Sequence, residues 1–350
     1  MTKVLQKTAL YNAYKQAGAR CIEFAGYERP AWFSSMKEEH LAVRENAGVF
    51  DISHMGIFHV WGAGSDAFMQ KLSTNSVSKA LNSKMIYSMF LNESGMILDD
   101  VMFGKFNDIW HLIVNGSNKD KIANWMQAQK PADVEIKQKN STHSLIAVQG
   151  QNAADILDNL LDSPVSEIGR FNIASTQFNS VDVLACRTGY TGEDGFELMI
   201  AHSEVETLFN TLIENEVTPC GLAARDTLRI EFGLPLYGQE LSEQIHPLMT
   251  RYKWVVKFDE DFIGKQALLK LKEHDHLQAV GLELAEPLIA RPNYKIIQGG
   301  YVSSGTLSPI TGKSVALAFV PKNLAIIGSE VEVEIRKKSV AAKVVKVPFL

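Results

Sequence analysis

The sequence predicts an α+β fold, and three observations lead to it. Short strand-like runs dominate residues 57–148, with only two helical stretches among them, near 65–72 and 118–128. So few long helices argue against a doubly wound sheet, in which a helix follows almost every strand. After Gln278 the chain is rich in short apolar runs with glycine turns, which predicts a small barrel or sandwich. A length of 350 residues exceeds what one core usually holds, so two or three domains are expected.

The individual elements follow from hydrophobic periodicity. Residues 36–47 place charges at helical spacing around a few apolar positions, which predicts a surface helix that stops at Gly48. Six strand-like runs then occupy residues 56–60, 85–91, 97–103, 110–115, 133–138 and 145–149. Residues 151–233 alternate between helix and strand, and they end in a helix bounded by Gly221 and Gly233. The mixed and charged stretch 239–276 is expected to connect domains.

Composition and charge exclude several classes of protein. The net charge of −5 shows no excess of Lys and Arg, which phosphate binding needs, so no nucleic-acid partner is expected. No apolar run approaches the ~18 residues of a membrane helix, so no membrane association is expected. The N-terminus resembles neither a signal peptide nor a transit peptide, which predicts a cytoplasmic protein. Cys21, Cys186 and Cys220 are widely spaced without a C-x-x-C pair, so neither a metal site nor a disulfide is expected.

Three short motifs resemble known binding or catalytic patterns but fail on their spacing. Residues 62–67 read G-A-G-S-D-A after a strand, yet a dinucleotide fingerprint needs an acidic residue ~20 positions on, where Asn82 stands. Residues 312–314 read G-K-S, but a phosphate loop needs glycine at the position of Leu307. The segment Asp51-Ile52-Ser53-His54 contains the residue types of a hydrolase triad. Triad members come from separate parts of a chain, however, and no G-x-S-x-G elbow is present.

The segment 97–102, I-L-D-D-V-M, places two carboxylates side by side in a strand. Neighbouring side chains of a strand point to opposite faces, so one aspartate faces out and the other faces a core or a pocket. The pattern does not decide which one turns inward, because Leu98 shares a face with Asp100 and Val101 shares one with Asp99. A strand end with both acids solvated is the alternative.

Two further segments hold more polar residues than a fold alone requires. Residues 187–197 read R-T-G-Y-T-G-E-D-G-F-E, and glycines at this density let the backbone approach a ligand closely. Glu197 starts the following strand; a decorated hairpin is the alternative. Arg225 and Arg229 lie four residues apart on one face of the predicted helix. A buried guanidinium requires a carboxylate partner or an anionic ligand, whereas a solvated charged face is the alternative.

In this order along the chain, these segments resemble the glycine cleavage T-protein family. The resemblance runs essentially from end to end, as a series of short matches at the family's spacing. They are Thr8–Tyr11, Phe24–Gly26, Gly48–Gly56, Leu98–Asp100, Arg187–Glu197, Pro219–Asp226, Leu234–Gly238, Phe262–Lys265, Ser303–Pro309 and Val347–Phe349.

The resemblance implies a three-domain cloverleaf with mostly antiparallel sheets, a C-terminal β-barrel-like domain and a central folate channel. The first α+β domain is expected to be discontinuous. The expected ranges are 1–50 with 140–235 for the first domain, 51–139 for the second, 236–276 for a connecting segment and 277–350 for the barrel-like domain.

The activity implied by the resemblance is that of the aminomethyltransferase of the glycine cleavage system. An aminomethyl group on the dihydrolipoyl arm of the H-protein is split, ammonia leaves, and the co-substrate tetrahydrofolate becomes 5,10-methylenetetrahydrofolate. The implied partners are the lipoylated H-protein and, functionally, the P- and L-proteins. Two basic patches are candidates for docking an acidic carrier: Lys253 and Lys257 around Trp254, and Arg336-Lys337-Lys338. Solvated surface charges are the alternative for both patches.

The resemblance also implies the site residues. The family's catalytic aspartate is the second of the pair, which is Asp100 here, and a fixed carboxylate there stabilises positive charge that develops on a folate nitrogen. Glu197 matches a residue that accepts hydrogen bonds from the pterin, and Arg225 matches a pocket arginine. Tyr87, Asn115 and Arg291 are also expected in the channel, with Arg291 toward the carboxylates of the folate tail.

The chain departs from the family at three places. It has Gly95-Met96 where two glycines are usual, and Met is poorly suited to a positive φ. Gly104 replaces a tyrosine and is expected to loosen one channel wall. The chain stops at Leu350, a few residues before relatives often do, which leaves a C-terminal contact to the folate tail open.

Two rival interpretations stand beside this one. The first is another tetrahydrofolate-dependent demethylase, or the folate domain of a dimethylglycine-type oxidase. The second is the non-enzymatic folate-binding relative linked to iron–sulfur assembly. That relative carries a cysteine in a K-G-C-Y-type loop, whereas this chain reads Thr188-Gly189-Tyr190.

Overall fold

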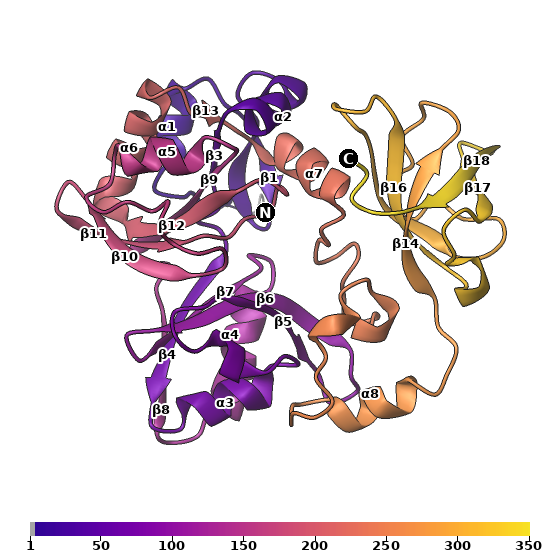
Figure 1. Cartoon of the computed structure of the whole chain (residues 1–350), viewed down its shortest axis with the longest axis horizontal. Coiled ribbons are helices and arrows are strands. Elements are labelled where there is room, and N and C mark those ends of the chain that lie inside the picture. Colours follow the sequence, from indigo (N-terminus) through magenta and orange to yellow (C-terminus); the bar gives the residue numbers. More distant parts are fainter. Residues whose placement is uncertain (1–3) are drawn as a thin grey trace. The chain divides into compact units, whose positions relative to one another are not determined.

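A computed structural model describes residues 4–350, so Met1, Thr2 and Lys3 of the N-terminal segment considered above lie outside the described residues. The chain divides into two compact units, whose elements are labelled in Figure 1. The first consists of residues up to Met69, Val77–Tyr87 and Val101–Arg225; the second consists of Gln70–Ser76, Ser88–Asp100 and Asp226–Leu350. Among residues 4–350, no helix combines the length and the apolar character needed to cross a membrane. The predicted ranges of the three domains and of the connecting segment stay a prediction.

A six-stranded sheet in the first unit has the strand order β10-β11-β12-β9-β3-β13. Its strands are β3 (Gly48–Asp51), β9 (His143–Gln149), β10 (Ile173–Phe178), β11 (Val181–Cys186), β12 (Gly195–Ala201) and β13 (Thr218–Pro219). The pairings are antiparallel except for the parallel pair β3–β13. The helices that pack on this sheet are α1 (Tyr11–Gln16), α5 (Ala153–Asp158) and α6 (His202–Glu214). Their apolar side chains share one buried core with strand residues such as Val148 and Leu198.

A hairpin and a helix precede β3. The hairpin strands are β1 (Arg20–Phe24) and β2 (Tyr27–Trp32), and helix α2 (Met36–Glu45) confirms the helix predicted at residues 36–47. Ser35 caps α2, because its Oγ accepts the N–H of Glu38 at 3.2 Å.

Helix α2 also carries a buried carboxylate. The Glu39 side chain accepts the N–H groups of Phe33 at 2.5 Å, Ser34 at 3.0 Å and Gly221 at 2.8 Å. Burial raises the pKa of Glu39, and these three donors act against that rise. Gly221 directly precedes helix α7 (Leu222–Phe232), so one carboxylate fixes both the entry to α2 and the entry to α7.

A five-stranded sheet has the order β5-β6-β7-β4-β8. Its strands are β4 (Gly56–Gly62), β5 (Ile86–Leu91), β6 (Ile97–Phe106), β7 (Ile109–Val114) and β8 (Val134–Gln138). Helices α3 (Ser65–Leu72) and α4 (Lys119–Gln129) lie along it (Figure 1), and the short helix η1 (Val77–Ala80) follows α3. Side chains alternate along β4: Phe58 and Val60 are buried, whereas His59 and Trp61 are partly exposed on the opposite face.

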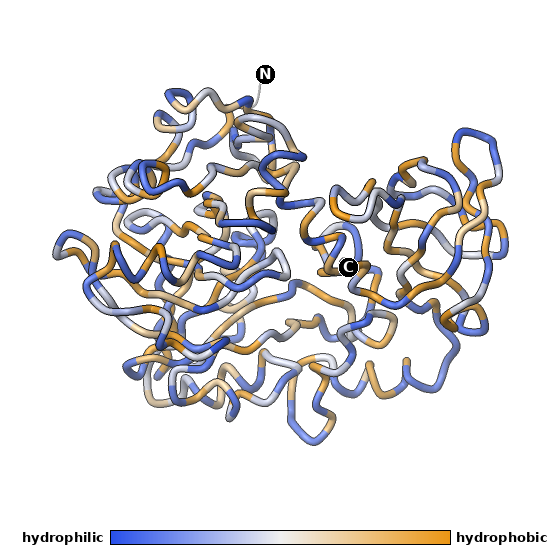
Figure 2. Tube along the Cα trace, turned by 45° about the horizontal axis from the view of Figure 1, so that its top comes forward, coloured by the Kyte–Doolittle hydropathy of each residue, from blue (hydrophilic) through white to orange (hydrophobic). Residues whose placement is uncertain are grey.

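The second unit contains the predicted barrel-like part. Its sheet has the order β15-β16-β14-β18-β17, and the sheet curls around its core (Figure 1). The strands are β14 (Gln278–Leu284), β15 (Tyr301–Leu307), β16 (Ser314–Val320), β17 (Glu330–Ile335) and β18 (Lys338–Val345). Hydrophilic and hydrophobic residues are interspersed along the chain (Figure 2). Strand β17 exposes its glutamates while burying Val331 and Val333, whereas β16 is buried along its whole length. The remaining helices are short: η2 (Pro247–Met249), η3 (Lys253–Val255), α8 (Lys265–Leu271) and η4 (Lys322–Leu324). The predicted α+β class, mostly antiparallel with a C-terminal barrel-like sheet, is confirmed.

Two of the departures from the family pattern have a local structural basis. In the turn before β6, Gly95 has a φ of +80°, whereas Met96 is not in the left-handed region. The turn therefore needs only one glycine, and Gly95 supplies it. Gly104 is buried, and a Cβ at this position would lie 2.5 Å from the Lys84 carbonyl oxygen. Its missing side chain leaves no gap, because backbone occupies the space.

Candidate active site

Asp99 and Asp100 are adjacent on β6, and Asp99 is the one that turns inward. The Asp99 residue is 0% exposed, whereas Asp100 is partly exposed. The predicted alternation is confirmed, and the structure adds which aspartate is which. Burial favours the neutral form of a carboxyl group, so the more accessible Asp100 is better suited to act as an anion.

Asp100 has a neutral phenol among its neighbours in the second unit. Burial, together with the charge of Asp100, raises the pKa of Tyr252 to about 12. The Tyr252 hydroxyl donates to the Gly233 carbonyl at 3.0 Å. Tyr252 therefore stays protonated near neutral pH, and its proton is directed to the backbone.

The glycine-rich segment 187–197, which leads from β11 into β12, contains three acids, and two of them have structural partners. Asp194 forms two hydrogen bonds with Arg187, at 2.6 and 3.1 Å, which close the loop. Glu193 pairs with Arg44 of α2 at 2.8 Å. Glu197, near the start of β12, forms no ion pair of this kind; its carboxylate accepts the neutral hydroxyl of Thr188 at 2.7 Å. Glu197 is thus the acid of this loop that fold stabilisation accounts for least.

The two arginines of α7 also differ in whether their charged groups have partners within the protein. Arg229 is 2% exposed and pairs with Glu240 at 2.8 Å and with Asp226 at 2.8 Å. Its third contact at 2.8 Å is to the Ser304 hydroxyl, so its guanidinium is held within the second unit. Arg225 has a buried Nη1 atom that makes no hydrogen bond. A buried donor without a partner is costly, which indicates that Arg225 is arranged for a ligand.

Arg225 lies beside Tyr190 and close to Glu197 in the first unit. Its Cζ is 4.5 Å from the centroid of the Tyr190 ring, a cation–π geometry. Burial lowers the pKa of Arg225, and the charges of Tyr190 and Glu197 oppose that shift. The structure thus brings together a planar cation, an aromatic ring and a carboxylate. Such a group can hold a flat heterocycle that presents both hydrogen-bond donors and acceptors.

The segment 51–54 forms no catalytic triad, because the side chains of Asp51 and Ser53 have structural partners. The buried carboxylate of Asp51 pairs with Arg29 at 3.0 Å and accepts the Thr8 hydroxyl at 2.7 Å. The Ser53 hydroxyl donates to the Leu145 carbonyl at 3.2 Å, so it is engaged with backbone. Burial, followed by the charges of Arg29 and Arg225, holds the pKa of His54 well below its usual value. His54 is therefore a neutral neighbour of two cations.

The other predicted site residues have the following positions. Tyr87 on β5 and Asn115 just after β7 are partly buried and belong to the first unit, as do Glu197 and Arg225. Arg291 is exposed on the loop between β14 and β15, in the second unit with Asp100. The grouping of all six residues into one channel stays a prediction. Among residues 4–350, no cluster of three or more His, Cys, Asp or Glu side chains is suited to a metal ion.

Tyr190 is a residue of this group that was not among the predicted site residues. It appears in the glycine-rich loop, but nothing in a strand or helix period marks it, because the loop follows neither period. The only available signal is an aromatic residue between Gly189 and Gly192, at a place where turns usually carry small or polar side chains.

Comparisons with known proteins identify the family. Residues 10–260 match the GCVT N-terminal domain, and residues 278–350 match the glycine cleavage T-protein C-terminal barrel domain. These two domains, in this order, define a class that combines an α+β N-terminal part with a terminal barrel. The chain belongs to the glycine cleavage T-protein family.

Relatives agree with that conclusion over the whole chain. An aminomethyltransferase from Staphylococcus haemolyticus (strain JCSC1435) is 41% identical over 358 residues, covering 99% of this chain and 98% of that protein. The crystal structure of the glycine cleavage system aminomethyltransferase T from Bartonella henselae superimposes with a TM-score of 0.93 at 29% identity. That match covers 99% of this chain and 98% of the other. The predicted family is confirmed.

Proposed function

We propose that this protein is an aminomethyltransferase of glycine cleavage, which moves a one-carbon unit from a lipoyl-bound aminomethyl group to tetrahydrofolate. Family membership and the aminomethyltransferase relative at 41% identity support the reaction class. In the overall reaction, ammonia and a dihydrolipoyl carrier are released, and tetrahydrofolate accepts the carbon as a methylene bridge.

The observation that carries the proposal is the unpartnered Nη1 of Arg225. A pterin is flat and has a carbonyl oxygen as well as several N–H groups. Arg225 can donate to the oxygen through Nη1, which no protein group occupies. Glu197 can accept from the N–H groups, and the Tyr190 ring beneath Arg225 keeps the guanidinium plane in place. The residues present therefore fit tetrahydrofolate as a substrate.

Asp100 is proposed to act on the developing charge. When a nitrogen of tetrahydrofolate attacks the one-carbon unit, positive charge appears on that nitrogen. A fixed carboxylate stabilises this charge without reorganising, and its contribution is typically worth ~10²-fold or more in rate. The role belongs to Asp100 rather than Asp99, because Asp99 is enclosed in the protein core.

The carbon donor is the lipoylated H-protein, which works with the P- and L-proteins. Trp254 is 55% exposed, and exposed aromatic side chains are enriched at protein interfaces, so the surface around Trp254 and Lys253 is a candidate docking surface. All three cysteines are free thiols, in keeping with a reducing compartment, and we infer a cytoplasmic location.

A reconstituted assay tests the proposed function. The purified protein is mixed with P-, H- and L-proteins, glycine and tetrahydrofolate, and formation of 5,10-methylenetetrahydrofolate is measured. Asp100→Asn serves as the inactive control and Lys37→Gln as a surface control. A wild-type rate no higher than that of Asp100→Asn would refute the proposal. Methylene transfer from sarcosine or dimethylglycine in place of the loaded H-protein would instead favour a demethylase.

A further inference from the structure

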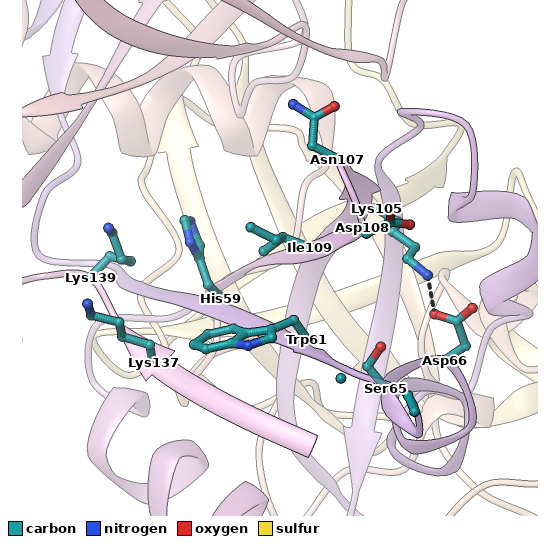
Figure 3. Close-up of a pocket in the computed structure, with 12 residues that line it drawn as sticks. His59, Trp61, Ser65, Asp66, Lys105, Asn107, Asp108, Ile109, Lys137 and Lys139 are labelled. Atoms are coloured by element: carbon teal, nitrogen blue, oxygen red, sulfur yellow. Dashed lines mark hydrogen bonds and ion pairs between the residues drawn. The ribbon is translucent and has the colours of Figure 1, made fainter. Parts of the chain in front are cut away.

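A groove of about 640 Å³ lies on the sheet β5-β6-β7-β4-β8 (Figure 3), and no residue of the glycine-rich segment 187–197 lines it. It is lined by β4, by Lys137 at the end of β8, by Lys139 just beyond it and by the turn between β6 and β7. None of the six predicted site residues lines the groove: Asp100, Glu197, Arg225, Tyr87, Asn115 and Arg291. Its volume falls within the range of small-molecule sites, about 300–1,000 Å³. The groove is thus a candidate site separate from the proposed folate site.

One end of the groove is cationic. Lys137 and Lys139 lie together there, next to His59 and Trp61 (Figure 3). Lys137 stands opposite His59 in the strand pairing, so the two side chains share a face of the sheet. Among residues 4–350, neither lysine has a carboxylate within 4.0 Å. Partial burial and the charge of Lys137 lower the pKa of Lys139, which is the effect expected for neighbouring cations without a counter-ion.

The other end of the groove carries Asp66 and Asp108 beside Lys105, so it has no excess of positive charge. There Asp66 accepts Lys105 at 2.7 Å and the indole N–H of Trp110 at 2.9 Å (Figure 3). Asp66 is therefore engaged and does not balance Lys137 and Lys139. The positive charge that lacks a partner is confined to the end that also carries the Trp61 ring.

The wall between the two ends can accept a flat molecule. Trp61 and Ile109 are partly exposed apolar side chains that line the groove. His59 beside them has a buried Nε2 without a hydrogen-bond partner. Burial, with contributions from His111 and Lys139, lowers the pKa of His59 to about 3, so its ring is neutral at pH 7. A neutral imidazole and an indole form a surface for stacking, and an anionic group would lie on the two lysines.

From this arrangement we propose that the groove binds a small planar molecule that carries a phosphate or carboxylate group. The ring packs on Trp61 and Ile109, and the anion is held by Lys137 and Lys139. The ligand is a second one, independent of tetrahydrofolate and of the lipoyl carrier.

Fluorine NMR of protein labelled with 5-fluorotryptophan tests the proposal directly. The chain has five tryptophans, and Trp61→Phe identifies the Trp61 signal. The probes are adenosine 5′-monophosphate, which has both ring and phosphate, and adenosine and ribose 5-phosphate, which each lack one of them. We expect a saturable shift of the Trp61 signal with adenosine 5′-monophosphate, with the signals of Trp32, Trp125 and Trp254 unchanged. The two partial probes should bind at least about tenfold more weakly.

Paired variants separate this site from general charge effects. Lys137→Gln with Lys139→Gln should weaken adenosine 5′-monophosphate binding about tenfold or more, while Lys37→Gln with Lys322→Gln removes the same charge elsewhere and should not. The first pair should leave aminomethyl transfer unchanged, so the result is independent of the proposed function. Absence of a saturable Trp61 shift, equal binding of adenosine, or equal effects of the two lysine pairs would each overturn the proposal.

Discussion

The guanidinium of Arg225 lies over the ring of Tyr190, with 4.5 Å between Cζ and the ring centroid. The ring supports one face of the guanidinium, and the Nη1 atom makes no bond within the protein. The neighbouring arginine of the same helix, Arg229, has its charge compensated by Glu240 and Asp226. One helix thus presents an arginine suited to ligand binding and an arginine that holds the fold.

Lysine substitutions should separate these two arginines. Arg225→Lys loses the planar fork and should raise the KM for tetrahydrofolate about tenfold or more, with little change in melting temperature. Arg229→Lys should lower the melting temperature by several degrees, because it breaks a buried network. Steady-state kinetics and thermal unfolding of both variants check this. Unchanged KM in Arg225→Lys would remove Arg225 from the binding site.

Substitution of Asp100 should mainly affect kcat, whereas substitution of Asp99 should mainly affect stability. Asp100→Asn should lower kcat by roughly 10²-fold or more while the protein stays folded, because it removes one electrostatic stabiliser. Asp99→Asn should have a much smaller effect on kcat and a larger one on unfolding, because Asp99 is fully buried. Rates measured on folded protein decide between them. Equal losses of kcat, or a larger loss for Asp99→Asn, would contradict the role of Asp100.

Glu197 should be required for stabilisation by the co-substrate. Tetrahydrofolate at about 100 times its dissociation constant should stabilise the wild type by roughly 2.7 kcal/mol through mass action. Glu197→Ala should abolish the resulting rise in melting temperature. Glu193→Ala is the matched control, since this acid of the same loop pairs with Arg44 and should keep the rise. A shift of full size in Glu197→Ala would place the pocket elsewhere.

The paired rings of His59 and His111 should make the protein sensitive to mild acid. The pKa of His59 is lowered to about 3 and that of His111 to about 4, in both cases mainly by burial, and the two rings meet edge to face with centroids 4.4 Å apart. In the unfolded chain, these two histidines bind protons with the ordinary pKa of about 6.5. The contribution of the neutral rings to the free energy of unfolding is therefore full above that pH and is lost as the pH falls toward 4.

Thermal unfolding between pH 7 and 4.5 measures this effect. His111 alone should account for a loss on the order of 2 kcal/mol across that interval. His111→Gln should be less stable at pH 7 but should show a shallower decline with acid. A decline as steep as that of the wild type would show that carboxylates dominate the acid response instead.

Docking of the carrier protein should depend on the C-terminal lysines. If they steer an acidic carrier, Lys337→Glu with Lys338→Glu should raise its KM and leave that for tetrahydrofolate unchanged, and salt should slow association. Lys338 pairs with Glu286 at 2.7 Å, so reversal also disturbs a local pair. Lys313→Glu is the matched control, because Lys313 pairs with Glu283 at 3.0 Å. A carrier KM that responds to neither salt nor reversal would rule out electrostatic docking through this patch.

The sequence predicts the elements well, because their signals are local. The helix at 36–47, the strands of both N-terminal sheets and the β-rich end follow from periodicity and turn residues. The inward direction of Asp99 could not be predicted, since apolar residues flank both faces of β6 and packing decides between them. The structural roles of Asp194, Glu193 and Arg229 depend on partners such as Arg187, Arg44 and Glu240. Only the folded chain shows that these charges are compensated and that Arg225 keeps a free donor.

The carboxylate of Glu39 joins parts of the chain that are made far apart in time. Its acceptor bond to Gly221 spans 182 residues, and β13 completes the sheet edge only three residues before that glycine. On the ribosome, a nascent chain that has emerged as far as β12 still has a buried acid that lacks one of its three donors. The first unit cannot complete this set of hydrogen bonds until residue 221 has left the exit tunnel. Chaperone binding during this delay is the expected consequence. Truncated chains that end before Gly221 should accumulate as aggregates.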